Sequence, residues 1–166
     1  MQHACSLEKL VFINFKISIF DHILFISFHK KNIMKENPKF AVIGGGSWAT
    51  AIAKMLCVNL PEIAWYMRNE DAISHLKEFH HNPNYLSSVE FHIEQLRLTS
   101  DINEAIEYAD YIVFAIPSAF LDGELKKLTA SLKDKVIFSA IKGIVPETSL
   151  IVGEHFHIQY DIPYYN

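Results

Sequence analysis

The chain has 166 residues, half of them hydrophobic, and carries 15 Lys and Arg against 19 Asp and Glu, a formal net charge of -4. This balance argues against a nucleic-acid-binding protein, which typically has a basic surplus. The apolar content excludes a largely disordered chain. Two cysteines, Cys5 and Cys57, without a Cys-x-x-Cys pair exclude a disulfide framework and a zinc knuckle. The length suffices for one sizeable core, so we expect one domain.

Residues 1–33 differ in pattern from the rest of the chain. Their apolar stretch is interrupted by polar and charged residues, whereas a membrane-spanning helix needs ~20 mostly apolar residues. We expect no signal peptide, because this segment lacks a basic start and a small-residue cleavage site. Apolar residues instead alternate with polar ones, as in a half-buried strand, at Ile13, Phe15, Ile17 and Ile19. Our hypothesis is that the natural protein starts at Met34, that residues 1–33 are an upstream extension and that residues 34–166 form the domain.

From residue 40 onward, short apolar runs alternate with amphipathic stretches. A strand over 40–43 precedes a helix over 48–58, and a strand over 63–67 precedes a helix over 71–79 that Asp71 can cap. A weak strand over 96–99, a helix over 102–109 capped by Ser100 or Asp101, and a strong strand over 111–116 follow. The last predicted elements are a helix over 120–132, a strand over 136–139 and a helix over 147–155 after Pro146. This order predicts an α/β fold with right-handed crossovers and a doubly wound parallel sheet.

A glycine-rich loop joins the first predicted strand to the first predicted helix. Gly44-Gly45-Gly46-Ser47-Trp48-Ala49 fits the pattern G-x-G-x-x-G/A. Gly44 allows the tight turn, Gly46 lets a pyrophosphate approach the backbone, and Ala49 keeps the helix close to the strand. The first N–H groups of the helix are then available to phosphates. In this context the motif predicts a dinucleotide-binding fold of the Rossmann type, with a plain tight turn or a methyltransferase-type loop as the alternatives.

The end of the second predicted strand bears on the choice of cofactor. An acidic residue there binds the ribose 2′-hydroxyl of NAD, whereas Arg accommodates the 2′-phosphate of NADP. Arg68 is the first charged residue and favours NADP, while Glu70 leaves NAD open. The alternative is a surface arginine that precedes a helix.

Five motifs in chain order resemble the bacterial type of NAD(P)-dependent glycerol-3-phosphate dehydrogenase. They are the glycine loop continued by Thr50-Ala51, Trp65-x-x-Arg68, Asn82-Pro83-Asn84-Tyr85-Leu86, Ala109-Asp110 followed by Ala115-Ile116-Pro117-Ser118, and Lys142-Gly143-Ile144. The resemblance covers about residues 39–154. Two departures from the family pattern are Ala49, where many members have Gly, and Ile141, where Thr is usual.

The resemblance implies hydride transfer between NAD(P)H and dihydroxyacetone phosphate, which gives sn-glycerol 3-phosphate for phospholipid synthesis. It implies that Ser47, Trp48 and Arg68 contact the cofactor, that Lys142 touches cofactor and substrate, and that Phe120 corresponds to an aromatic residue lining the cofactor site in some members. It further implies a cytoplasmic protein and a homodimer in the full-length family.

The sequence pattern by itself also indicates a candidate role for Lys142. It follows the fifth predicted strand, at the carboxyl edge of the sheet, where open α/β folds bind ligands. A fixed ammonium group at that edge would stabilise the negative charge on a ketone oxygen during reduction. The alternative is a solvated surface lysine, the usual state of this residue type.

In the resembled family a helical second domain supplies the lysine that acts as general acid or base, and this sequence ends at Asn166 before such a domain. We therefore expect cofactor binding without appreciable turnover. Two other hypotheses remain, a non-catalytic nucleotide-binding module and a fragment of another two-domain dehydrogenase acting on a hydroxy acid or sugar nucleotide. The histidines lack further ligands at a suitable spacing, so we expect no metal site, and Cys57 is expected to be a buried helix residue.

Overall fold

The computed structural model describes residues 37–163, and the expectations for residues 1–33 lie outside this range. Five parallel strands form the central sheet in the order β3-β2-β1-β4-β5. They are β1 (Phe40–Ile43), β2 (Ile63–Tyr66), β3 (Leu96–Thr99), β4 (Tyr111–Phe114) and β5 (Val136–Ser139). This order confirms the predicted doubly wound Rossmann-type sheet.

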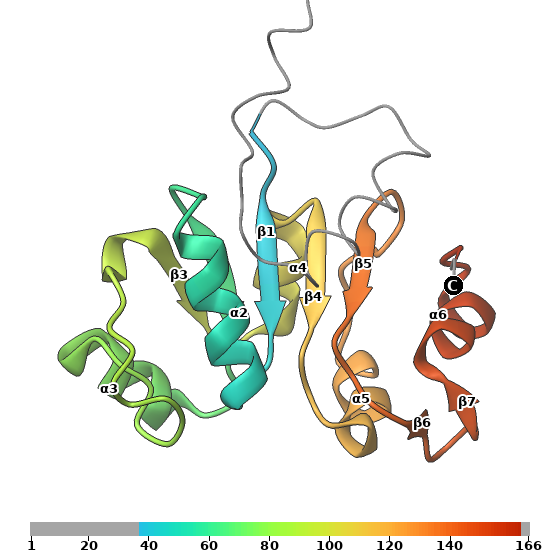
Figure 1. Ribbon diagram of the computed structural model, residues 1–166. Helices are drawn as coiled ribbons and strands as arrows, with labels where there is room; N and C mark the ends of the chain where they lie inside the picture. Colours follow the sequence, from blue (N-terminus) through green and yellow to red (C-terminus); the bar gives the residue numbers. More distant parts are fainter. Residues whose placement is uncertain (1–36, 164–166) are drawn as a thin grey trace, which may run out of the picture. The chain divides into compact units, whose positions relative to one another are not determined.

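The strands in the middle of the sheet are buried because helices cover both faces. All residues of β1, β2 and β4 are buried, as expected of parallel strands with continuous apolar sequences. The helices α2 (Ser47–Cys57) and α4 (Ile102–Tyr108) lie on opposite faces, with α2 in front of β1 in Figure 1 and α4 behind. Ala41 and Ile43 of β1 pack into the same core cluster as the apolar side chains of α4.

The helix caps agree only partly with the sequence-based expectations. Asp101 caps α4, because its side chain accepts a hydrogen bond from the N–H of Asn103. For α3 (Glu70–Phe79), the expectation that Asp71 is the cap is wrong. The cap is Asn69, whose side chain accepts hydrogen bonds from the N–H groups of Asp71 and Ala72.

The helix predicted over 120–132 is shorter and starts earlier, as α5 (Ser118–Leu125). Its expected second half turns away because the N–H groups of Thr129 and Ala130 donate to the side chain of Asn103 instead of to helix carbonyls. Leu132 is nevertheless buried in the core. Leu121, Leu125 and Leu132 have the spacing of one helix face and are all buried, but the helix ends at Leu125.

The last part of the chain also differs from the expected helix over 147–155. A two-stranded antiparallel hairpin of β6 (Ile144–Val145) and β7 (Leu150–Ile151) precedes α6 (Val152–Tyr160). The turn of the hairpin occupies the residues expected to start the helix, and the N–H of Ser149 there donates to the carbonyl of Val145. Residues 93–95 form a short 3-10 helix, η2 (Ile93–Gln95), just before β3.

Candidate dinucleotide site

The glycine-rich loop lies at the point of the sheet where the strand order reverses. The chain passes from β1 to β2 and β3 on one side, and β4 and β5 continue on the other. Ile43, the last residue of β1, is paired with Tyr66 of β2 and with Phe114 of β4. Ligands of open α/β sheets bind beyond the carboxyl ends of the strands at such a position.

Gly44 turns the chain out of β1 in a conformation that side chains rarely adopt. Its φ is +133°, and a Cβ atom there would lie 2.5 Å from the carbonyl oxygen of Ala115. The close approach of β1 and β4 at their carboxyl ends therefore requires glycine. Gly46 is different, since a Cβ atom there would meet nothing within 4 Å and its φ of -84° is ordinary.

The carbonyl groups of all three loop glycines accept hydrogen bonds from the protein. The donors are Trp65 Nε1 to Gly44 at 2.7 Å, Asn82 Nδ2 to Gly45 at 3.1 Å, and both the amide and the hydroxyl of Thr50 to Gly46 at 2.9 Å. Three successive carbonyl oxygens are thus directed into the protein.

The N–H groups that follow have no such partners. Within residues 37–163, the N–H groups of Gly45, Gly46, Ser47 and Trp48 donate to no protein acceptor. The first turn of α2 contains no acidic residue, and Ser47 and Trp48 are exposed. Ala49, in the first turn of α2, is fully buried, as the packing role predicted for it requires. A helix N-terminus of this kind is suited to bind an anion.

Arg68 and Phe120 lie together at the carboxyl edge of the sheet, the edge at which the glycine-rich loop leaves β1. Arg68 follows β2 and Phe120 belongs to α5, and the guanidinium carbon lies 5.2 Å from the centre of the Phe120 ring. Both residues line an open cleft of about 430 Å³. The two lysines of the cleft pair with acids, Lys126 with Asp122 and Lys127 with Glu124. Arg68, by contrast, forms no ion pair with any residue from 37 to 163.

A buried carboxylate joins α5 to the end of β2 next to Arg68. Glu124 is 5% exposed and accepts hydrogen bonds from the Tyr66 hydroxyl at 2.5 Å and from the Lys127 ammonium group at 2.9 Å. Burial, and then the hydrogen bond to Glu124, raise the pKa of Tyr66 well above its usual range. This linkage fixes α5, and with it Phe120, relative to the strand that carries Arg68.

Lys142 lies at the same edge of the sheet as the glycine loop. Ser139 ends β5 beside Phe114 of β4, and the next residues leave the sheet there. Gly143 has a φ of +89°, and a Cβ atom on it would lie 4.0 Å from Ser118 Oγ at the start of α5. The Lys142 side chain is exposed and pairs with no other group in the described part of the chain.

The predicted site residues therefore gather at one sheet edge in three groups. These are the loop residues Gly44, Gly46, Ser47, Trp48 and Ala49, the pair Arg68 and Phe120, and Lys142. Their roles toward a ligand stay predictions. The sequence pattern assigns no role to Asn82 beyond its place in a family motif. Trp65 is fully buried, and its indole also holds the loop.

No group of three or more His, Cys, Asp or Glu among residues 37–163 is arranged to hold a metal ion. No helix in this range is both long enough and apolar enough to cross a bilayer.

Comparison with known proteins agrees with this geometry. Residues 39–162 match the family model described as the N-terminus of NAD-dependent glycerol-3-phosphate dehydrogenase. The glycerol-3-phosphate dehydrogenase (NAD(P)+) of Nitratidesulfovibrio vulgaris strain DP4 is 37% identical over 117 residues, which are 70% of this chain and 35% of that protein. That of Ectopseudomonas mendocina is 33% identical over 121 residues, 73% of this chain and 35% of that protein.

Solved structures show the same fold at lower identity. The glycerol-3-phosphate dehydrogenase of Plasmodium falciparum superposes with a TM-score of 0.65 at 21% identity and covers 84% of this chain and 41% of its own. The enzyme from Coxiella burnetii gives a TM-score of 0.60 at 23% identity, covering 69% of this chain and 35% of its own. The chain thus spans about a third of the length of the curated relatives it matches, 35% of the first two. It belongs to the family of NAD-dependent glycerol-3-phosphate dehydrogenases and matches the N-terminal domain of that family.

Proposed function

We propose that the chain binds NAD or NADP through its glycine-rich loop and serves as the cofactor-binding part of a glycerol-3-phosphate dehydrogenase. The observation that carries the proposal is the arrangement of the loop peptides. Their carbonyl oxygens are held by Trp65, Asn82 and Thr50, while their N–H groups have no acceptor in the described protein. Such a row of unused donors at a helix N-terminus fits the pyrophosphate of a dinucleotide.

The adenosine half of the cofactor is assigned to the cleft beside Arg68. That arginine stands at the end of β2, where this fold places the adenosine ribose. It has no carboxylate partner among residues 37–163, so its guanidinium group can form charge-assisted hydrogen bonds with a 2′-phosphate. Glu70 accepts a hydrogen bond from Ser100 Oγ at 2.8 Å but keeps further acceptor positions for the 2′-hydroxyl of NAD. The guanidinium group of Arg68 therefore favours NADP, while Glu70 leaves NAD open.

Lys142 has a proposed role in the reduction of dihydroxyacetone phosphate to sn-glycerol 3-phosphate. Bound NAD(P)H supplies the hydride in this chemistry. The exposed ammonium group of Lys142, at the carboxyl edge of β5, attracts the phosphorylated substrate and stabilises the negative charge that develops on its ketone oxygen. This role rests on family membership and on the position of Lys142 in the fold.

Equilibrium binding of NADPH and NADH tests the cofactor assignment. We expect Arg68→Ala to weaken NADPH binding by about tenfold or more, because a charge-assisted hydrogen bond contributes about 1.5–3 kcal/mol, and to change NADH binding much less. Arg97→Ala is the matched control. Arg97 also lies over an aromatic ring, at 4.9 Å from the centre of Tyr108, but it pairs with Glu62. Equal NADPH affinity in the Arg68 and Arg97 variants would remove Arg68 from the site.

Binding of dihydroxyacetone phosphate to the cofactor-saturated protein tests Lys142 separately. Lys142→Met should weaken this binding, whereas Lys133→Met should not. Both lysines are exposed and flank β5, but Lys133 precedes the strand and therefore lies at the opposite edge of the sheet. An unchanged affinity in Lys142→Met would show that the lysine does not face the substrate.

A further inference from the structure

Asn82 is a buried polar side chain in the segment between α3 and η2, next to the glycine-rich loop. It is 1% exposed, and its amide forms four hydrogen bonds. The nitrogen donates to the Gly45 carbonyl at 3.1 Å and to Thr50 Oγ1 at 3.0 Å, and the oxygen accepts from the N–H groups of Asn84 and Tyr85. These partners fix the orientation of the amide, because a carbonyl needs a donor and an N–H needs an acceptor.

The bond to the Gly45 carbonyl determines the direction of the next N–H group. In a trans peptide the C=O and the following N–H point in opposite directions, and the described residues contain no cis peptide bond. With the Gly45 oxygen held toward Asn82, the N–H of Gly46 points away from Asn82. A Cβ atom on Gly46 would meet open space, so an approaching ligand is not blocked there.

The Thr50 hydroxyl fixes the orientation of the next peptide, the one between Gly46 and Ser47. It accepts from Asn82 and donates to the Gly46 carbonyl at 2.9 Å. The Gly46 oxygen is therefore held toward the helix, and the N–H of Ser47 points the other way. Three consecutive glycines have a large conformational freedom, so this loop needs fixed external partners to keep its donors aligned.

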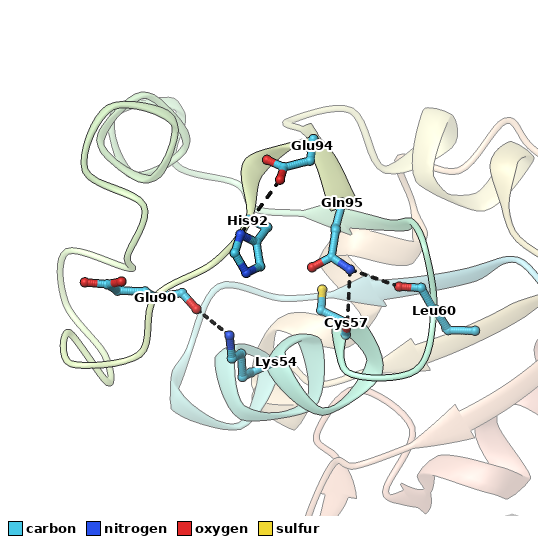
Figure 2. A network of polar contacts seen from close by, with 7 residues as sticks. All are labelled: Lys54, Cys57, Leu60, Glu90, His92, Glu94 and Gln95. Atoms are coloured by element: carbon cyan, nitrogen blue, oxygen red, sulfur yellow. Dashed lines mark hydrogen bonds and ion pairs between the residues drawn. The ribbon is translucent and has the colours of Figure 1, made fainter. Parts of the chain in front are cut away.

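The opposite end of α2 is held by Glu90 of the same segment and by Gln95 of η2, which follows it. Figure 2 shows Gln95 donating from its side-chain nitrogen to the carbonyls of Cys57 and Leu60, at 3.1 and 3.2 Å. Lys54, in the last turns of the helix, donates to the Glu90 carbonyl at 2.6 Å. Gln95 and Lys54 thus attach the C-terminal half of the helix, whereas Asn82 alone reaches the glycine loop from this segment.

We propose that Asn82 is a positioning residue of the dinucleotide site, which aligns the N–H groups of Gly46 and Ser47 toward the cofactor pyrophosphate. The inference rests on the proposed function and deepens it. Asn82 does not contact the cofactor; it acts through the Gly45 carbonyl and the Thr50 hydroxyl. Its loss should weaken pyrophosphate binding and leave recognition of the adenosine half unchanged.

Two substitutions separate the donor function of Asn82 from its packing. Asn82→Asp keeps the oxygen that accepts from Asn84 and Tyr85 but places a carboxylate oxygen against the Gly45 carbonyl, which turns the peptide away. Asn82→Ala removes the side chain without adding charge. Asn84→Asp and Asn84→Ala are matched controls, because the Asn84 side chain is exposed and lies in the same loop. Where Asn82→Ala gives no folded protein, Asn82→Asp carries the test.

The full chain is titrated with ADP-ribose, which contains the pyrophosphate, and with adenosine, which does not. Both Asn82 variants should bind ADP-ribose about tenfold more weakly than the wild type, the loss expected for one hydrogen bond to an oriented loop, and adenosine equally well. Both Asn84 variants should bind both ligands as the wild type does.

The contrary outcomes are distinguishable. Unchanged ADP-ribose affinity in both Asn82 variants would overturn the role of Asn82 and leave the proposed function standing. An equal loss of ADP-ribose and adenosine binding, with a lower melting temperature, would show a merely structural role. A wild-type chain that binds neither ADP-ribose nor NADPH would overturn the proposed function itself, and the role of Asn82 with it.

Discussion

Replacing Gly44 by alanine should damage the fold, and replacing Gly46 by alanine should damage only cofactor binding. At Gly44 the added Cβ atom would lie 2.5 Å from the carbonyl oxygen of Ala115 and 3.0 Å from both the carbonyl carbon of Ala115 and Ile116 Cγ2. Two of these atoms are backbone, so they cannot move without displacing the end of β4. The φ of +133° adds strain for any residue that has a Cβ.

The expected loss of folding stability in Gly44→Ala is the sum of these two effects, the steric overlap and the backbone strain. A residue with a Cβ in such a backbone region costs about 1–3 kcal/mol, and overpacking against fixed atoms costs about 1–3 kcal/mol more. The expected loss for Gly44→Ala is therefore about 4 kcal/mol, a large share of the ~5–15 kcal/mol by which domains are stable. For a domain of this size it corresponds to a decrease in melting temperature of about 15 °C.

Gly46→Ala is the matched comparison, since it makes the same chemical change two residues away. Its Cβ meets nothing within 4 Å, and its φ of -84° and ψ of -175° suit any residue. The stability change should stay within about 1 kcal/mol, because the entropic gain from alanine offsets its poorer capping of α2. The methyl group nevertheless occupies the space into which the pyrophosphate approaches, so NADPH affinity should fall about tenfold or more.

Thermal unfolding followed by circular dichroism measures the first effect, and NADPH titration at a temperature where each variant is folded measures the second. A Gly44→Ala protein that melts with the wild type would refute the packing argument for the β1–β4 junction. A Gly46→Ala protein that binds NADPH as tightly as the wild type would refute the proposal that the pyrophosphate lies next to Gly46.

Gln95→Ala should lower the free energy of unfolding by about 1–2 kcal/mol in urea titrations, since it leaves two carbonyls at the end of α2 without a donor, and should leave NADPH affinity unchanged. Burial raises the pKa of Cys57 to about 11, so its alkylation by iodoacetamide in the folded protein should stay slow at pH 9 and increase as the pH rises toward 11. Burial, and then the hydrogen bond to Glu62, raise the pKa of Tyr108 to about 12. Its contribution to stability is therefore complete below pH 10 and lost as the pH rises through 12, so wild type and Tyr108→Phe should differ in the steepness of alkaline unfolding.

The strands and the doubly wound parallel sheet could be predicted because they depend on the residue pattern within short segments of the chain. A parallel strand with helices on both faces must be apolar throughout, and β1, β2 and β4 show this in their sequences. The end of α5 and the start of α6 could not be predicted in this way. They depend on Asn103 taking the N–H groups of Thr129 and Ala130, and on a hairpin turn closing onto the carbonyl of Val145.

The residues of the candidate site also differ in whether the sequence alone could predict them. The small residues at Gly44 and Ala49 could be predicted because packing against β4 and against the sheet leaves no space for larger side chains there. Gly46 is not restricted by the protein's own atoms, so its role toward a ligand stays a prediction. Asn82 could not be predicted, since its partner Gly45 is 37 residues away and an asparagine before a proline reads as an ordinary turn. Its resemblance to a family motif was visible, but no residue pattern says which carbonyl it holds.

The glycine pattern alone therefore does not make an anion site. It guarantees only that the backbone can turn and that a ligand can approach, and both conditions hold for many orientations of the three loop peptides. The orientation that directs N–H groups outward is set by donors outside the loop, the indole of Trp65 and the amide of Asn82. A chain with the same glycines but without these donors would keep the turn at Gly44 and lose the alignment at Gly46. Under the proposed function, binding of a pyrophosphate to this loop therefore depends on side chains of β2 and of the segment that follows α3.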